Sequence, residues 1–158
     1  MRHLVDGKLD HSVALLFAAG SRPSVRDVEA LSLAQEQFAI SLNGGPRPGG
    51  AQWVELLANG LTFDLSGLGG GPAEEAVGGA HFMGLPVEAD LSAYEVVTLV
   101  PGPHLVSGGP MVPVLRCLAW LAAELAGLDG LHAIVWTAAR TVCAPDYFRE
   151  GVNRWLSG

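Results

Sequence analysis

The stretch YEVVTLVPGPHLVSGGPMVPVLRCLAWLAAEL, residues 94–125, decides the fold. Residues 95–100 are rich in β-branched and apolar side chains, which predicts a buried strand. Glycine and proline in residues 101–109 predict a tight loop. The segment from Pro110 is apolar almost all round and predicts a helix. Such a helix must be covered on most sides, so we expect the rest of the chain to pack around it.

A second apolar run, VALLFA, occupies residues 13–18 near the start of the chain. An unbroken run of this length is typical of a central strand that is buried on both faces. After a turn, Ser24 is an expected helix N-cap, and Asp27 completes a capping box three residues later. Apolar residues at helical spacing then predict a helix that runs to about Ala39.

The middle of the chain alternates between loops and a hairpin. The segment NGGPRPGG, residues 43–50, predicts a loop because it cannot hold a helix or an interior strand. Residues 53–58 and 61–65 flank the dipeptide Asn59-Gly60, which favours a type I′ turn. These two segments therefore predict a β-hairpin with one face exposed to solvent.

The remaining segments complete the order of elements. The glycine-rich segment 67–80 predicts a long surface excursion with room for one helical turn. The apolar segment 81–87 is expected to return the chain to the core. Residues 132–137 predict the last strand, and Pro145 fits the first turn of a closing helix.

These elements follow the order βα, ββ, βαβα. The order predicts a single α+β domain over residues 1–158, built as a mixed sheet with helices packed on it. It places the chain near the ferredoxin-like topologies.

Composition limits the partners. The formal net charge is −7, and no cluster of Lys or Arg stands out. Nucleic acids and anionic membranes attract basic patches, so we expect neither as a partner. The apolar helix from Pro110 is too short and too charged to span a bilayer.

Cys117 and Cys143 lack metal-type spacing and are expected to be free thiols, with a disulfide between them as the alternative.

The apolar run at residues 13–18 has two interpretations. Its length suits the apolar part of a signal peptide as well as a buried strand. The preceding segment carries Asp6 and Asp10 beside Arg2 and Lys8, so it lacks the positive charge of a signal peptide. We therefore favour a strand and expect a cytoplasmic protein.

The loop 102–109 is the first candidate site. A loop between a strand and a helix N-terminus can bind an anion through free backbone N–H groups, and Ser107 and Gly108 would contribute to it. The loop matches neither phosphate-binding fingerprint. Its glycines are equally consistent with a plain chain reversal, so both interpretations stay open.

Three further side chains are candidates for chemistry. His104 lies in the same loop and would act as a neutral base or ligand. Cys143 precedes the closing helix, where a thiol can have a lowered pKa and act as a nucleophile. Arg140 follows the last strand and could bind a carboxylate or a phosphate. The alternatives are a surface His, an inert Cys and an exposed Arg in a turn.

Histidine spacing and tryptophan placement add two expectations. The histidines show no local pairing that is typical of metal sites, so we expect no metal and no cofactor. Trp120 and Trp155 occupy predicted core positions. Trp53 begins the solvent-exposed hairpin, where it either forms part of a partner surface or packs under the neighbouring loop.

Three motifs together resemble a widespread bacterial family of unknown function. They are the segment MGLP at residues 83–86, the Trp-containing strand AIVW at 133–136 and the segment PDYF at 145–148. The resemblance spans about residues 13–155. It implies the fold and a bacterial origin, and it implies no catalytic residues.

Two functional hypotheses follow from the residues. The first is a non-enzymatic module that binds another protein or a second copy of itself, in a regulatory or toxin-neutralising role. The second is a small-molecule-binding protein or enzyme with a site formed by the 102–109 loop, Arg140 and Cys143. The second hypothesis requires His104, Arg140 and Cys143 to converge on one pocket.

Overall fold

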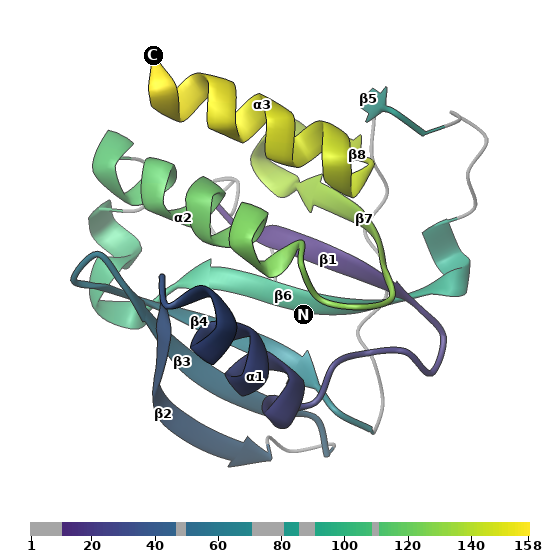
Figure 1. Ribbon diagram of the computed structural model, residues 1–158, viewed down its shortest axis with the longest axis vertical. Helices are drawn as coiled ribbons and strands as arrows, with labels where there is room; N and C mark the ends of the chain where they lie inside the picture. The colour runs from purple at the N-terminus through teal and green to yellow at the C-terminus, as the bar shows by residue number, and fades with distance from the viewer. Residues whose placement is uncertain (1–10, 47–49, 71–80, 86–90, 109–110) are drawn as a thin grey trace.

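The predicted α+β fold is confirmed by the computed structural model, which describes residues 11–46, 50–70, 81–85, 91–108 and 111–158. Within these residues, three α-helices pack on a mixed sheet of eight strands (Figure 1). The strands are β1 (Val13–Ala18), β2 (Ala39–Pro46), β3 (Gln52–Ala58), β4 (Leu61–Leu68), β5 (His81–Met83), β6 (Tyr94–Pro101), β7 (Leu131–Trp136) and β8 (Thr141–Cys143). The helices are α1 (Val25–Gln35), α2 (Val112–Leu125) and α3 (Pro145–Ser157), with short 3₁₀ helices η1 (Leu91–Ala93), η2 (Pro103–Gly108) and η3 (Thr137–Ala139).

The sheet has the strand order β2-β3-β4-β6-β1-β7-β8-β5. Neighbouring strands run antiparallel, except for β5 and β8, which are parallel. The apolar run at residues 13–18 is confirmed as a central strand, because β1 lies between β6 and β7. Leu15 and Leu16 point to opposite faces and both have no exposed surface.

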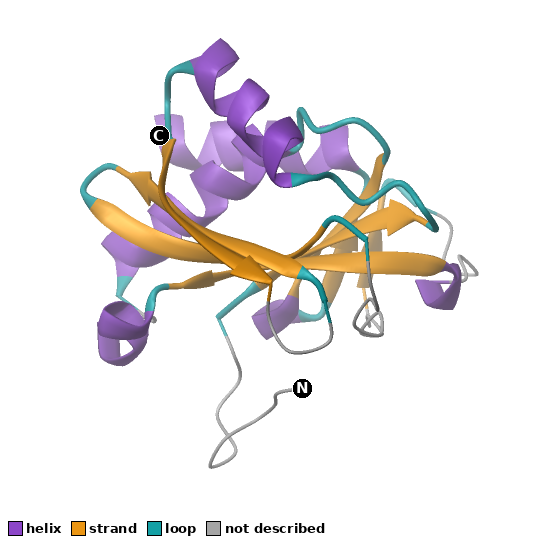
Figure 2. Cartoon of the chain, turned by 90° about the horizontal axis from the view of Figure 1, so that it is seen from below, coloured by secondary structure: helices purple, strands orange, loops and turns teal. Residues whose placement is uncertain are grey.

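The main core lies between the sheet and the helices. Figure 2 shows α1, α2 and α3 on one side of the sheet. Val28 of α1, Leu118 of α2 and Phe148 of α3 are buried there against strand residues such as Phe63 and Leu15. We call the opposite side of the sheet the open face. A smaller core on that face includes Leu16, Val96 and Val135.

The Asn59-Gly60 hairpin is confirmed. Ala58 of β3 pairs with Leu61 of β4, so the loop holds only the two predicted residues. Asn59 has φ 51° and Gly60 has φ 78°, and positive φ at both positions is the requirement of a type I′ turn. This turn fixes the register of β3 against β4.

The predicted helix after Ser24 forms with the expected capping box. The Ser24 side chain accepts a hydrogen bond from Asp27 N, and the Asp27 side chain accepts one from Ser24 N. The prediction that the helix reaches Ala39 is wrong. Glu36 adopts a left-handed conformation with φ 58°, which ends α1 at Gln35.

The residues that follow form β2. The prediction of a loop over residues 43–50 is therefore wrong for residues 43–46, which belong to this strand. Among the described strands, β2 pairs with β3 alone and forms one edge of the sheet. Edge strands tolerate Gly and Pro because one side makes no ladder hydrogen bonds. The register shifts at Ser41 and Gly44, so β2 contains two bulges that accommodate its irregular sequence.

Several predicted segments are described only in part. β4 continues to Leu68, three residues beyond the predicted hairpin strand, while residues 71–80 lie outside the described residues. The apolar segment 81–87 forms the short strand β5 at its start. Gly109 and Pro110 also lie outside the described residues, and α2 is described from Val112. Within the described residues, no helix has the length and apolar character needed to cross a membrane.

The C-terminal region contains one strand that was not predicted, and one tryptophan in it is exposed where a core position was predicted. β8 pairs with β7 and lies one strand from the edge, although it has only three residues. In α3, Phe148 and Val152 are buried as expected. Trp155 is 47% exposed, so its predicted core position is wrong. It lies near the C-terminal end of α3, where its ring packs beside Arg116 instead of entering the core.

Candidate functional site

His104 is fixed to the end of β4. Its Nε2 atom lies 3.2 Å from Thr62 Oγ1, and the Gly102 N–H donates a 2.9 Å hydrogen bond to the Thr62 carbonyl oxygen. A Cβ atom at Gly102 would lie 2.9 Å from Thr62 Oγ1, so the close approach of this loop requires glycine. The His104 side chain is exposed and holds the loop against β4.

The rest of the predicted anion loop forms a short helix. Ser107 and Gly108 are the last residues of η2. The N-cap of α2 is Met111, which provides no side-chain hydrogen bond to the helix. Ser107 is therefore part of a 3₁₀ turn that precedes α2 by several residues, and it is not the capping residue of that helix.

Arg140 ends η3 in a left-handed conformation with φ 53°. Its N–H donates to the Thr137 carbonyl oxygen over 3.1 Å, and its own carbonyl oxygen accepts a 3.1 Å hydrogen bond from His81 N. The side chain is exposed. The backbone of Arg140 thus connects the turn after β7 to the edge strand β5.

Cys143 is buried, with 7% of its surface exposed, and it belongs to the core beneath the helices. Burial raises the pKa of its thiol, because the charged thiolate loses its hydration. An activated nucleophile requires the opposite shift. Cys117 is also a free buried thiol whose pKa is raised mainly by burial, and its Sγ donates to the Ala58 carbonyl oxygen over 3.5 Å.

The predicted site residues lie at separate places along the sheet. His104 contacts Thr62 of β4, whereas Arg140 directly precedes β8. β6, β1 and β7 lie between these two strands. At about 4.8 Å per neighbouring pair, β4 and β8 are roughly 19 Å apart. The two regions therefore do not face one another across a small-molecule pocket.

The side chains that could bind a metal do not form a cluster either. Among the residues that the structure describes, no group of three or more His, Cys, Asp or Glu side chains could hold a metal ion. His132 stacks on Tyr94 with ring centroids 4.5 Å apart. His81 contributes its backbone to the pairing of β5 with β8.

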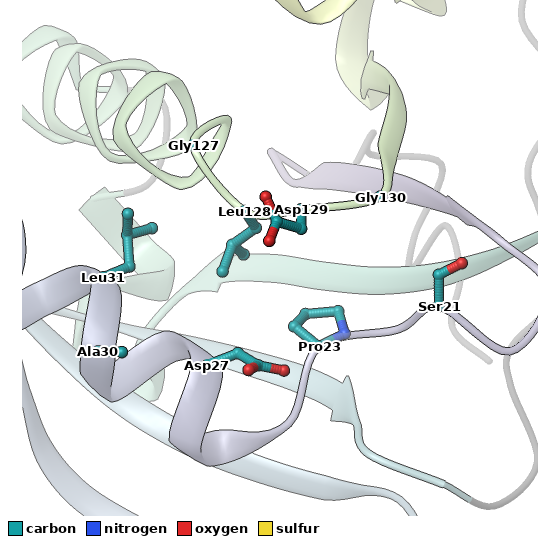
Figure 3. A pocket seen from close by; sticks show the side chains of 9 residues that line it. All are labelled: Ser21, Pro23, Asp27, Ala30, Leu31, Gly127, Leu128, Asp129 and Gly130. Atoms are coloured by element: carbon teal, nitrogen blue, oxygen red, sulfur yellow. The ribbon is translucent and has the colours of Figure 1, made fainter.

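A hollow of about 550 Å³ lies between the turn before α1 and the turn after α2 (Figure 3). Asp27 and Asp129 place their side chains on its rim, and Leu31 lines its apolar side. Asp27 already accepts the capping hydrogen bond from Ser24 N. None of the side chains predicted from sequence as site residues lines this hollow.

The most distinctive surface of the described chain is the edge at β2. Three leucines near this edge are strongly exposed: Leu33 by 71%, Leu42 by 50% and Leu57 by 42%. Leu33 of α1 and Leu57 of β3 line one shallow hollow with Ala39, the first residue of β2. We define the β2 edge surface as β2 together with Leu33 and Leu57. This surface was not predicted from the sequence, because the glycines and prolines of residues 43–50 favour a loop.

Leu42 lies on the open face of the sheet. It pairs with Glu55 of β3, whose neighbours Val54 and Leu56 point to the helices. The bulge at Ser41 also places the Ser41 hydroxyl where it donates to Glu55 Oε1 over 2.8 Å. Glu55 is thereby held by a neighbour within the sheet, and Leu42 is left beside it as an exposed apolar side chain.

Trp53 supports the far end of β2. Its indole ring occupies the space where a Cβ atom at Gly44 would stand. Trp53 is half-buried, which agrees with the interpretation that it packs against the neighbouring glycine-rich segment. Gly44 and Trp53 together therefore fix the second bulge of β2.

Comparisons of the chain with protein-family models, with curated protein sequences and with solved structures found no match.

Proposed function

We propose that this protein is a non-enzymatic protein-binding module and that the β2 edge surface is its binding site. The observation that carries the proposal is an edge strand without charged side chains, which contains exposed Leu42 and lies beside exposed Leu33 and Leu57. An unpaired edge presents a row of backbone N–H and C=O groups, and an extended segment of a partner can add to it as a further strand. Exposed leucines provide apolar contacts for the side chains of that segment.

The alternative proposal, an enzyme or small-molecule site at the 102–109 loop, has less support. It needs an activated nucleophile, and burial raises the pKa of Cys143. It also needs His104 and Arg140 near each other, and three strands lie between the strands to which they are attached. A regulatory or toxin-neutralising role remains our proposal for the binding module.

The proposed context of the protein is the bacterial cytoplasm. In support, the apolar run at residues 13–18 forms the central strand β1, and cleavage after this run would remove the strand from the middle of the sheet. A ferredoxin-like relationship is supported by four strands in the order β4-β6-β1-β7. Helix α1 follows β1 and helix α2 joins β6 to β7, as in two interleaved strand–helix–strand units.

A peptide-display selection tests the binding site. A library of random peptides is selected on the immobilised protein, and binding is then measured to the wild type, Leu42→Lys and Val112→Lys. Val112 is a matched control because it is 60% exposed but lies on α2. We expect enriched peptides to bind the wild type and Val112→Lys and to lose at least tenfold in affinity for Leu42→Lys. Peptides that bind all three proteins equally would contradict the proposal, as would a lack of any enrichment on a protein that is monomeric.

A further inference from the structure

We infer that the partner of the β2 edge surface is a second copy of this chain, with the two β2 strands paired antiparallel about a two-fold axis near Leu42. This inference rests on the proposed function, because it assigns the occupant of the same edge. Two identical edges can pair in this way because a two-fold axis makes the contact self-complementary. The paired strands would join the two sheets into one.

The charge pattern favours this pairing. Each copy carries a formal net charge of −7, so two copies repel one another over most of their surfaces. Residues 37–46, which include all of β2, contain no charged side chain. Glu55, the carboxylate next to Leu42, accepts a hydrogen bond from Ser41 of the same copy. β2 itself thus brings no charge to the contact between two acidic copies, and Glu36 lies beside its first residue, Ala39, in the hollow lined by Leu33 and Leu57.

The position of Leu42 fits a symmetric contact. Opposite residues in neighbouring strands point to the same face of a sheet. A two-fold axis perpendicular to the sheet at Leu42 therefore brings the two Leu42 side chains together on the open face. Each side chain is 50% exposed in the single chain, and the contact would remove apolar surface from water on both copies.

The two edge strands of the sheet differ in length, and this difference favours a dimer over larger assemblies. β2 has eight residues, whereas the other edge strand, β5, has three. Pairing through β2 uses both long edges and, of the strands that the structure describes, leaves the two short β5 edges. The bulges at Ser41 and Gly44 also limit the length of the new ladder. A closed and reversible dimer is therefore expected, without further growth into fibres.

Sedimentation equilibrium of the full chain over a wide concentration range tests the inference. We expect the wild type and Val112→Lys to approach twice the monomer mass of 16.4 kDa at high concentration. Leu42→Lys is expected to remain monomeric, because two like charges would face each other. Circular dichroism shows whether each variant is folded, and exposed Leu42 tolerates a polar side chain.

A charge-swap experiment tests the symmetric contact directly. Leu42→Lys and Leu42→Glu are each expected to be monomeric alone, and their mixture is expected to form a heterodimer that weakens with added salt. Dimers of Leu42→Lys alone, or a mixture that stays monomeric, would overturn the inference. A monomeric wild type with Leu42-dependent peptide binding would overturn the dimer and leave the proposed function in place. A monomeric wild type without such peptide binding would overturn both.

Discussion

Arg22 Nε lies 2.9 Å from Glu95 Oε1, and this ion pair joins the turn after β1 to the start of β6. The Arg22 side chain is only 5% exposed and also donates a 2.9 Å hydrogen bond to the Gly67 carbonyl oxygen in β4. Glu95 Oε1 accepts a further hydrogen bond from Gly20 N over 3.2 Å. One buried guanidinium thus links three segments that are far apart in the sequence.

Replacing Glu95 should therefore destabilise the fold. Glu95→Ala leaves the buried guanidinium of Arg22 without its carboxylate and removes the acceptor for Gly20 N. Loss of a hydrogen-bonded charge of this kind costs about 2 kcal/mol of unfolding free energy. Urea unfolding at neutral pH measures the effect. Glu150→Ala, an exposed carboxylate on α3, is the control and should change the unfolding free energy by less than about 0.5 kcal/mol.

The same contacts predict that the stability of the fold depends on pH. Hydrogen bonds from Gly20 N and Arg22 hold the pKa of Glu95 below its ordinary value of 4.5. A lowered pKa means that the stabilisation is complete above the ordinary pKa and is lost as the pH falls through the folded-state pKa. The stability difference between the wild type and Glu95→Gln should therefore be constant from pH 7 to about 5 and shrink on further acidification. A difference that stays the same down to pH 3 would contradict this assignment.

The extent to which the sequence predicts the fold varies between elements. β1 and the hairpin at Asn59-Gly60 were predictable, since an unbroken apolar run and a turn-specific dipeptide are local signals. β2 was not predictable in the same way. Its residues Asn43 to Pro46 favour a loop locally, and they form a strand because β3 offers a free edge and Trp53 packs over Gly44. Long-range packing of this kind leaves no mark in the local sequence.

For the candidate site too, local features were predictable from the sequence and long-range features were not. His104 and Arg140 were correctly expected near strand ends, which chain order alone reveals. Their separation depends on strand order, and strand order cannot be read from one sequence. The raised pKa of Cys143 likewise depends on burial beneath the helices. The exposure of Leu33 and Leu57 could not be predicted from the sequence, since single apolar residues in a helix and a strand are normally part of a core.

Cys143 should react slowly with alkylating reagents. Its thiol is buried and its pKa lies above the ordinary value of 9.0, so little accessible thiolate forms at neutral pH. The rate for Cys143 in a Cys117→Ala background, measured with iodoacetamide between pH 6 and 10, should stay far below that of the urea-unfolded chain. Rapid alkylation of the folded protein below pH 8 would instead reveal an activated thiolate and restore the enzyme hypothesis.

Gly44 and Trp53 provide the last prediction. A Cβ atom at Gly44 would overlap the indole ring of Trp53, so Gly44→Ala must displace either the ring or β2. Overpacking of this kind costs about 1–3 kcal/mol. Urea unfolding should show this loss of stability, and the fluorescence of Trp53 should change in the folded state.

The control is Gly70→Ala, because an added Cβ at Gly70 meets no atom within 4 Å. That variant should match the wild type in both measurements. Trp53→Leu removes most of the overlapping ring, so adding Gly44→Ala to this background should cost much less than it does in the wild type. Equal costs in the two backgrounds would show that the two residues act independently. A strong coupling would show that the Trp53 ring sets the bulge at Gly44 and thereby shapes the edge through which we expect this protein to bind.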